Sequence, residues 1–295
     1  MDGQKWAESV TAERKAEARG LRRAALRKIG NSFFRSWSYA ASGFEKALAY
    51  LLAERRGEQG LIWQTAHGKV WKTTLPGALG EDTVVLKRYV GKRRWRHFCV
   101  PSPAAREAVN FLMLSSLGFP TVDLLAVGDN RRFLYLRDSF IVTRFLGDGF
   151  RDGIVFMRQT PEAGDDALRD SFLSAVLRQL AAMHSVKCLH RTSHPYSFLW
   201  RRSGKDAEGV EVVLIDVSSC RFKSARGFDN WVVYDLTKLF RNLRMSRETL
   251  KRHMDFYLSL NPGCGLSADR LALLVPTAGS GPGKSAKEAK HAATS

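Results

Sequence analysis

Short runs in which apolar and polar residues alternate dominate the chain between residues 61 and 146. The runs LIWQTAHGKVWKTTL and DTVVLKRYV, separated by the turn-like PGALGE, predict strands. The segments VDLLAVGD, RRFLYLRD and SFIVTRFL each predict a further strand. A helix is predicted over residues 103–117, because Pro103 suits a first helical turn and Gly118 suits a helix end. We therefore expect this part of the chain to be rich in sheet.

Beyond residue 146 the hydrophobic period becomes helical. Phe172, Val176, Leu180 and Met183 recur at helical spacing and predict an amphipathic helix over residues 165–187. The apolar run EVVLIDV predicts one short strand, and a further helix is expected near residues 231–243. Strands first and helices later favour an α+β fold, with a sheet-rich N-terminal lobe followed by a helical C-terminal lobe.

The first 57 residues mix Arg, Lys and Glu with Ala and Leu, a composition that favours helix. Leu21, Ala25 and Ile29 can share one face among basic residues, and aromatic residues follow at 33–39. A basic amphipathic helix of this kind either lies on an anionic membrane surface or packs on its own domain. The sequence leaves both interpretations open.

The last twenty residues are small and polar, which predicts disorder. Within them, AGSGPGKS loosely matches a phosphate-binding loop, but too few residues follow it to build the α/β domain that such a loop requires. The expected organisation has four parts. They are a basic helical extension (1–57), an N-lobe (58–146), a helical C-lobe (147–275) and a disordered tail (276–295).

The net charge of the 295-residue chain is +18. Such a charge favours an anionic partner, namely nucleic acid, a membrane surface or a phosphorylated substrate, although a solvated basic surface is also compatible with it. Nucleic acid is disfavoured, because no helix-turn-helix, zinc-finger or aromatic RNA-binding signature occurs. The four cysteines include no C-x-x-C pair, and no apolar run approaches the roughly 20 residues that span a bilayer. We therefore expect a cytoplasmic protein.

The segment HSVKCLHRTSHPYSFLW resembles a kinase catalytic loop, which has the form H-R-D-x-x-x-x-N. His190 and Arg191 occupy the first two positions, but Thr192 replaces the aspartate that accepts the substrate proton. Asp216 follows the apolar run VVLI, where a carboxylate needs a cation or hydrogen-bond donors. It is a candidate metal ligand, although an aspartate that caps a turn through Ser218 or Ser219 fits the same pattern.

Lys87, in TVVLKRY, matches the kinase V-A-I-K strand, whose lysine contacts ATP phosphates. Glu107 follows twenty residues later in the predicted helix, where it can pair with Lys87. Taken alone, Lys87 or Glu107 would be interpreted as an ordinary surface charge. The hypothesis of a kinase site depends on the order of the two residues along the chain relative to His190 and Asp216. No G-x-G-x-x-G precedes Lys87.

The ordered set VVLKRY, SPAAREAVNFLMLSSLGFPTVDLLAVGD, FIVTRFL, LAAMHSVKCLHRTSHPYSFLW, VVLIDVSSCRF and VYDLTKLFRNL resembles the bacterial lipopolysaccharide kinase family over residues 60–245. The resemblance implies a protein-kinase-like bilobal fold that uses ATP and Mg²⁺. It also implies an acceptor that is a lipopolysaccharide core sugar or another anionic glycolipid, reached at the cytoplasmic face of the inner membrane. Basic segments such as KRYVGKRRWRH would then contact anionic lipid.

The resemblance also implies a role for each site residue. Lys87 contacts the ATP phosphates and Glu107 orients it. Asp216 binds magnesium, Ser197 takes the second metal position, and Asp235 supports the catalytic loop. His190 and Arg191 brace that loop, while His184 and His194 are expected to be ordinary polar residues rather than members of a metal cluster.

Two positions depart from the family. Thr192 has no carboxylate, and its hydroxyl is not ionised near neutral pH, so it cannot act as a comparable base. Ser197 is a weaker metal ligand than the Asn or His expected at its position. The function that the resemblance implies is ATP-dependent phosphorylation of an inner-core sugar, and the alternative is a pseudokinase that binds ATP or a partner without phosphoryl transfer.

Overall fold

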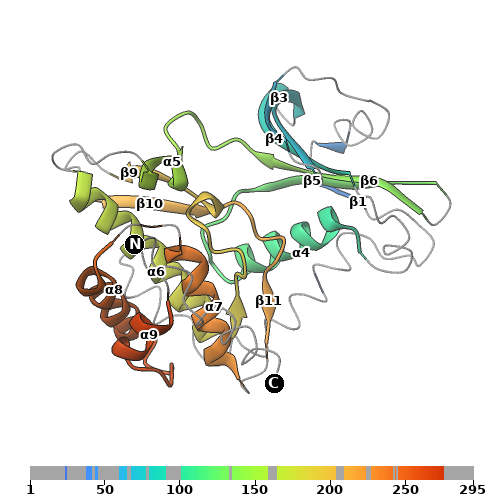
Figure 1. The fold of residues 1–295 in the computed structure, drawn as a ribbon. Coiled ribbons are helices and arrows are strands. Elements are labelled where there is room, and N and C mark those ends of the chain that lie inside the picture. The colour runs from blue at the N-terminus through green and yellow to red at the C-terminus, as the bar shows by residue number, and fades with distance from the viewer. Residues whose placement is uncertain are drawn as a thin grey trace. The chain divides into compact units, whose positions relative to one another are not determined.

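The computed structural model describes residues 24, 38–41, 44–45, 60–64, 68–77, 80–90, 101–132, 135–158, 165–203, 209–223, 227–241, 243 and 245–275. Within these residues the chain forms two compact units, which divide between Gly147 and Asp148. The first is built on sheet and the second mostly on helices (Figure 1). The prediction of a mixed fold with sheet-rich and helical parts is therefore confirmed.

A six-stranded antiparallel sheet forms the first unit, with the strand order β1-β5-β6-β4-β3-β2. Its strands are β1 (Ser38–Ala40), β2 (Leu61–Gln64), β3 (Gly68–Gly77), β4 (Gly80–Val90), β5 (Leu124–Arg132) and β6 (Tyr135–Arg144). Alternation along β4 places Leu86 and Lys87 on opposite faces of the sheet. The register aligns Leu86 with Trp71 on β3 and with Val142 on β6.

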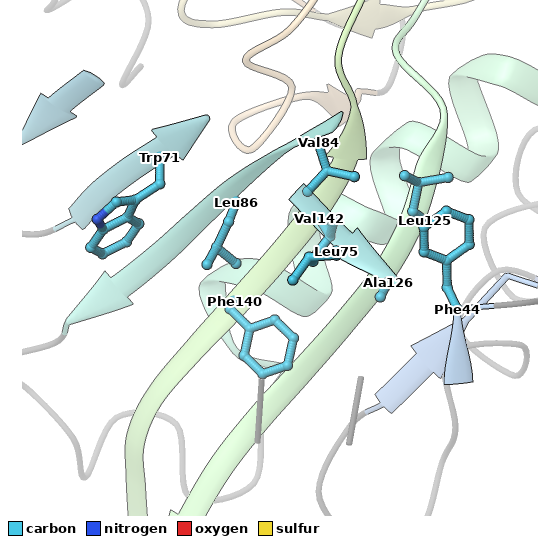
Figure 2. Packing of buried hydrophobic residues seen from close by; sticks show 9 residues of the cluster. All are labelled: Phe44, Trp71, Leu75, Val84, Leu86, Leu125, Ala126, Phe140 and Val142. Atoms are coloured by element: carbon cyan, nitrogen blue, oxygen red, sulfur yellow. The ribbon is translucent and has the colours of Figure 1, made fainter. Parts of the chain in front are cut away.

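The face that carries Leu86 packs an apolar core. Figure 2 shows this cluster, in which strands β3 to β6 contribute side chains beside Phe44. Its members are Phe44, Trp71, Leu75, Val84, Leu86, Leu125, Ala126, Phe140 and Val142. On the opposite face of β4, the Lys87 side chain contacts Glu107 of the helix α4.

Helix α4 (Pro103–Ser116) begins and ends close to the predicted positions. The Ser102 side chain accepts a hydrogen bond from the Ala105 backbone N–H, and Pro103 occupies the first turn. Gly118 follows the helix with φ +81°, a left-handed conformation in which glycine is favoured.

The three segments predicted between residues 122 and 146 form only two strands. RRFLYLRD is not a separate strand, because β5 continues through Arg132 and β6, which pairs with it, begins at Tyr135. The polar residues at the borders of the three predicted segments are paired between these strands: Asn130 donates to Asp138, and Asp129 lies opposite Ser139.

Part of the expected N-terminal helical extension lies in the sheet. Ser38–Ala40 pair with β5, and Phe44 is buried in the core, because this aromatic stretch finds an apolar surface on the sheet. Ala24 and Glu45 are helical. The other residues of the expected extension, and the expected disordered tail with its AGSGPGKS motif, lie outside the described residues.

Within its described residues, the second unit consists of the long helix α6, four further α-helices and several short strands (Figure 1). Its elements are β7 (Arg151–Asp152), α5 (Gly153–Arg158), α6 (Asp165–Ser185), β8 (Cys188–Leu189), the 3-10 helix η2 (Pro195–Ser197), β9 (Phe198–Ser203), β10 (Gly209–Leu214), β11 (Arg221–Phe222), α7 (Phe228–Phe240), α8 (Arg247–Leu260) and α9 (Ala268–Leu274). Strands β10, β9 and β7 form one sheet, and β11 pairs with β8.

The predicted apolar stripe of α6 is confirmed, since Phe172, Val176, Leu180 and Met183 are all fully buried. Helices α8 and α9 lie where the hydrophobic pattern predicts no element. The buried face of α8 includes His253 and Tyr257, whose polarity interrupts the apolar period. Among the helices described, none combines the length and apolarity needed to cross a membrane.

Candidate functional site

Asp235 holds the backbone of the catalytic loop. It lies on α7, it is fully buried, and its two carboxylate oxygens accept hydrogen bonds from consecutive backbone N–H groups. His190 N–H donates over 2.8 Å and Arg191 N–H over 2.6 Å. Hydrogen bonds to an ionised acceptor are stronger than neutral ones. The loop is thus fixed to α7 at the residues that follow β8.

A second layer of contacts holds Asp235 itself. The His184 ring lies between Asp235, at 3.2 Å from Nε2, and the Tyr257 hydroxyl, at 2.7 Å from Nδ1. The Asn261 side-chain amide donates to the same hydroxyl over 2.7 Å. His184 is therefore neither an ordinary polar residue nor a metal ligand: it links helices α6, α7 and α8 beneath the loop.

Electrostatics keep Asp235 ionised. Burial alone would raise its pKa, but the hydrogen bond from His184 and the nearby His184 and His190 rings, with the backbone N–H of His190, lower the pKa below the ordinary value. A carboxylate with a lowered pKa is charged at neutral pH and accepts hydrogen bonds at both oxygens.

The loop backbone has an uncommon conformation at Arg191. Its φ is +67°, in the left-handed region that a non-glycine residue adopts at a cost of about 1 kcal/mol or more. The hydrogen bond from the Arg191 N–H to Asp235 stabilises this turn. The guanidinium extends over the Trp231 ring of α7, with 5.5 Å between Cζ and the ring centroid. The chain thus turns sharply just before Thr192.

His190 is a buried structural residue. Its ring stacks on Phe198, with 5.4 Å between centroids, and desolvation by burial lowers its pKa. The ring is therefore neutral at pH 7. Its Nδ1 lies 3.4 Å from the Thr192 hydroxyl oxygen.

Thr192 and Ser197 are joined through the loop. The Ser197 hydroxyl donates to the Thr192 carbonyl, and the His194 backbone N–H donates to the same carbonyl over 2.7 Å. Ser197 is buried, whereas Thr192 is partly exposed. A hydroxyl that already donates to the backbone keeps only its lone pairs for a metal ion, so Ser197 is at most an auxiliary ligand.

Asp216 lies at the same end of the β9–β10 pair as Ser197. The Ile215 backbone N–H donates to the Ser197 carbonyl over 3.1 Å, and Leu214 pairs with Phe198. The Ser218 hydroxyl donates to the Asp216 carboxylate over 3.1 Å, which is the turn contact expected as the alternative to metal binding. The structure therefore brings the two candidate metal residues to adjacent strand ends.

The donor set fits magnesium with Asp216 as its one carboxylate ligand. Mg²⁺ binds through one or two carboxylates together with waters and substrate phosphates, so a partly buried carboxylate at a strand end suffices. No group of three or more His, Cys, Asp or Glu side chains suitable for a metal ion occurs in the part of the chain that is described. A dedicated all-protein metal cage is therefore not present there.

Lys87 and Glu107 meet in the sheet-rich unit. The Lys87 ammonium lies 3.0 Å from Glu107 Oε1, and the Glu107 side chain is 1% exposed. The Tyr89 hydroxyl donates to the other carboxylate oxygen, Oε2, and the Tyr89 ring lies 5.1 Å from the ammonium. Burial, followed by the charge of Glu107, raises the pKa of Tyr89 well above its usual value. Two strand residues thus fix one helix carboxylate.

The basic segment 87–97 is only partly described. Lys87 pairs with Glu107, and Arg88 pairs with Asp138 over 3.2 Å, so these two charges face carboxylates of their own unit. Residues 91–97 lie outside the described residues, and the expected contact of this segment with lipid stays a prediction.

A sheet-rich unit with a lysine–glutamate pair and a helical unit with an aspartate-held loop define a kinase-like class of protein. The sequence profile of the lipopolysaccharide kinase (Kdo/WaaP) family matches residues 84–257. This match covers more than half of the chain, which therefore belongs to the lipopolysaccharide kinase (Kdo/WaaP) family. Membership implies the use of ATP.

A solved structure described as WaaP in complex with acyl carrier protein has a similar fold, with a TM-score of 0.54 and 18% sequence identity. The alignment covers 86% of this chain and 98% of that chain. At this identity the likeness bears on the fold alone. A search of curated proteins finds no match.

Proposed function

We propose that the protein transfers the γ-phosphate of ATP to a sugar hydroxyl of the lipopolysaccharide inner core. The observation that carries the proposal is the ion pair between the partly exposed Lys87 and the buried Glu107, found in a chain of the lipopolysaccharide kinase family. Kinase catalysis depends mainly on positioning and charge neutralisation, and a fixed lysine ammonium supplies both for the phosphates. Tyr89 supports the pair by holding the second oxygen of Glu107.

In this mechanism Lys87 contacts the ATP phosphates, while Glu107 and Tyr89 prevent the ammonium from moving away. Asp216, with Ser197 as an auxiliary ligand, would hold Mg²⁺, which when bound would neutralise phosphate charge. Asp235 keeps the catalytic loop in its turn. The acceptor oxygen attacks the γ-phosphorus as the bond to ADP breaks.

The proton of the acceptor hydroxyl does not pass to Thr192, which has no carboxylate. In our proposal it leaves with solvent or with the transferred phosphate, and the reaction is slower for that reason. A base at this position typically contributes about 10²–10⁴ in rate. The contacts of Thr192 and Ser197 with the loop backbone also favour the alternative, a pseudokinase that binds ATP without transferring phosphate.

The acceptor sugar is a component of an anionic glycolipid, so the proposed reaction takes place at the cytoplasmic face of the inner membrane. The charge of +18 supports peripheral contact with that surface.

The proposal is tested by mass spectrometry of the lipopolysaccharide core from a strain that lacks the protein. We expect the core to lack one phosphate, which a wild-type copy restores and a Lys87→Ala copy does not. Lys251→Ala is the matched control. Lys251 forms an exposed ion pair with Asp269, so this variant should restore the phosphate fully. A core with unchanged phosphate content in the deletion strain contradicts the proposal.

A further inference from the structure

Helix α7 presents a stripe of aromatic and basic residues beside the catalytic loop. Trp231, Tyr234, Lys238 and Arg241 follow one another at intervals of three and four residues, so they lie on one side of the helix. Asp235 lies next to this stripe and holds the loop through two backbone hydrogen bonds. The stripe therefore borders the loop over which a phosphate acceptor has to lie.

Aromatic rings and cations are interleaved on this surface. Trp231 has Arg191 on it at 5.5 Å and Lys223 at 4.5 Å from the ring centroid. The Lys238 ammonium lies 5.2 Å from the centroid of the Tyr234 ring. The rings of Trp231 and Tyr234 contact each other edge to face, with 6.0 Å between their centroids. Trp231 and Tyr234 are both partly exposed. The rings thus hold several ammonium and guanidinium groups close to one another.

Among the described residues, no ion pair joins Arg191, Lys223, Lys238 or Arg241, the cations of this surface, to an acidic side chain. Several other basic residues of the same unit do form such pairs: Arg201 with Glu211, Lys251 with Asp269, and Arg252 with Asp170. Like charges that gather without a counter-ion create a positive potential that attracts anions.

The surface reaches the catalytic loop through Arg191. This loop residue follows His190, and its guanidinium lies over the Trp231 ring of α7.

We propose that this surface, which consists of Trp231, Tyr234, Lys238 and Arg241 with Arg191 and Lys223, binds the anionic groups of the saccharide acceptor. Lysine and arginine bind carboxylates and phosphates through charge-assisted hydrogen bonds. The exposed parts of the two rings offer flat apolar area to a sugar. A position beside the catalytic loop favours the saccharide over an acidic protein as occupant, because only the acceptor must bring a hydroxyl to the loop. That argument rests on the function proposed above.

The test is calorimetric binding of deacylated lipopolysaccharide core oligosaccharide, measured without ATP, to the Lys238→Gln/Arg241→Gln double variant. We expect Kd to rise about tenfold or more, since two charge-assisted contacts are lost. The matched control is Lys251→Gln/Arg252→Gln, which removes the same charge from α8 and should leave Kd within about twofold. Equal Kd values for the double variant and the control overturn the proposal.

Chemically altered oligosaccharides distinguish the anionic groups. Kd of the wild-type protein should be measured for the dephosphorylated and for the carboxyl-reduced oligosaccharide and compared with Kd for the untreated one. The group whose removal raises Kd is the one that this surface recognises. Binding that survives both treatments contradicts the proposal. If the double variant keeps the oligosaccharide but loses an acidic carrier protein, the surface is a protein-docking site and the proposal is wrong.

Failure of this inference is distinguishable from failure of the proposed function. Thermal stabilisation by ATP with magnesium should be the same in the double variant and the wild type, which shows that the variant is folded. In a protein that transfers phosphate, KM for the oligosaccharide should rise while KM for ATP stays unchanged. A protein that transfers no phosphate can still bind the oligosaccharide through α7.

Discussion

Asp235→Ala is expected to lower the free energy of unfolding of the helical unit by about 3–5 kcal/mol, the range for removing one partner from a buried charged network. The Asp235 side chain is fully buried and accepts from His190 N–H, Arg191 N–H and the His184 ring. Without it, the buried His190 N–H and the partly buried Arg191 N–H lose their acceptor, and the left-handed turn at Arg191 loses its support. Urea denaturation followed by far-UV circular dichroism measures the loss.

The control is Asp269→Ala, which removes a carboxylate that is 72% exposed and pairs with Lys251. Exposed ion pairs contribute about 0–1 kcal/mol, so this variant should unfold nearly as the wild type does. A loss below about 1 kcal/mol for Asp235→Ala would show that other contacts hold the loop.

Thr192→Asp is expected to increase phosphate transfer to purified core oligosaccharide by about 10²–10⁴-fold, the usual contribution of a positioned general base. Thr192 is partly exposed and follows the loop residues that Asp235 fixes, so a carboxylate here can reach an acceptor hydroxyl. Where the wild type shows no transfer, the variant should produce it. Initial rates with labelled ATP measure the change.

Thr192→Ser is the matched control, because it keeps the hydroxyl and adds no base; its rate should equal that of the wild type. Equal rates for the aspartate and serine variants would mean that the missing base does not limit transfer.

The hydrophobic period of the sequence predicts elements that are stabilised by burial along a single face. Helix α6 is confirmed because Phe172, Val176 and Leu180 all point into one core. The hairpin of β5 and β6 is predicted less well, because the sequence predicts three strands here and the structure has two. Polar residues such as Asn130 and Asp138 lie within the strands, where they pair with each other across the hairpin.

Contacts between candidate site residues are predicted where the motif order marks both partners, as it does for Asp235 and the catalytic loop, and are missed where it marks only one. Lys87 and Glu107 are only twenty positions apart and follow a known order. Tyr89 belongs to the same strand, but nothing in the alternation marks its hydroxyl as a partner of Glu107. His184 and Tyr257 are 73 positions apart, and α8, which carries Tyr257, is itself not predicted.

The central claim is that Lys87, Glu107 and Asp216 bind ATP with magnesium. The most direct measurement is the melting temperature of the protein with and without ATP and magnesium, for the wild type and for Asp216→Ala. We predict that the nucleotide raises the melting temperature of the wild type, because a ligand that binds only the folded state stabilises it, and that Asp216→Ala removes the magnesium-dependent part of the shift. A wild-type protein whose melting temperature does not change at saturating ATP and magnesium would contradict both the kinase and the ATP-binding pseudokinase.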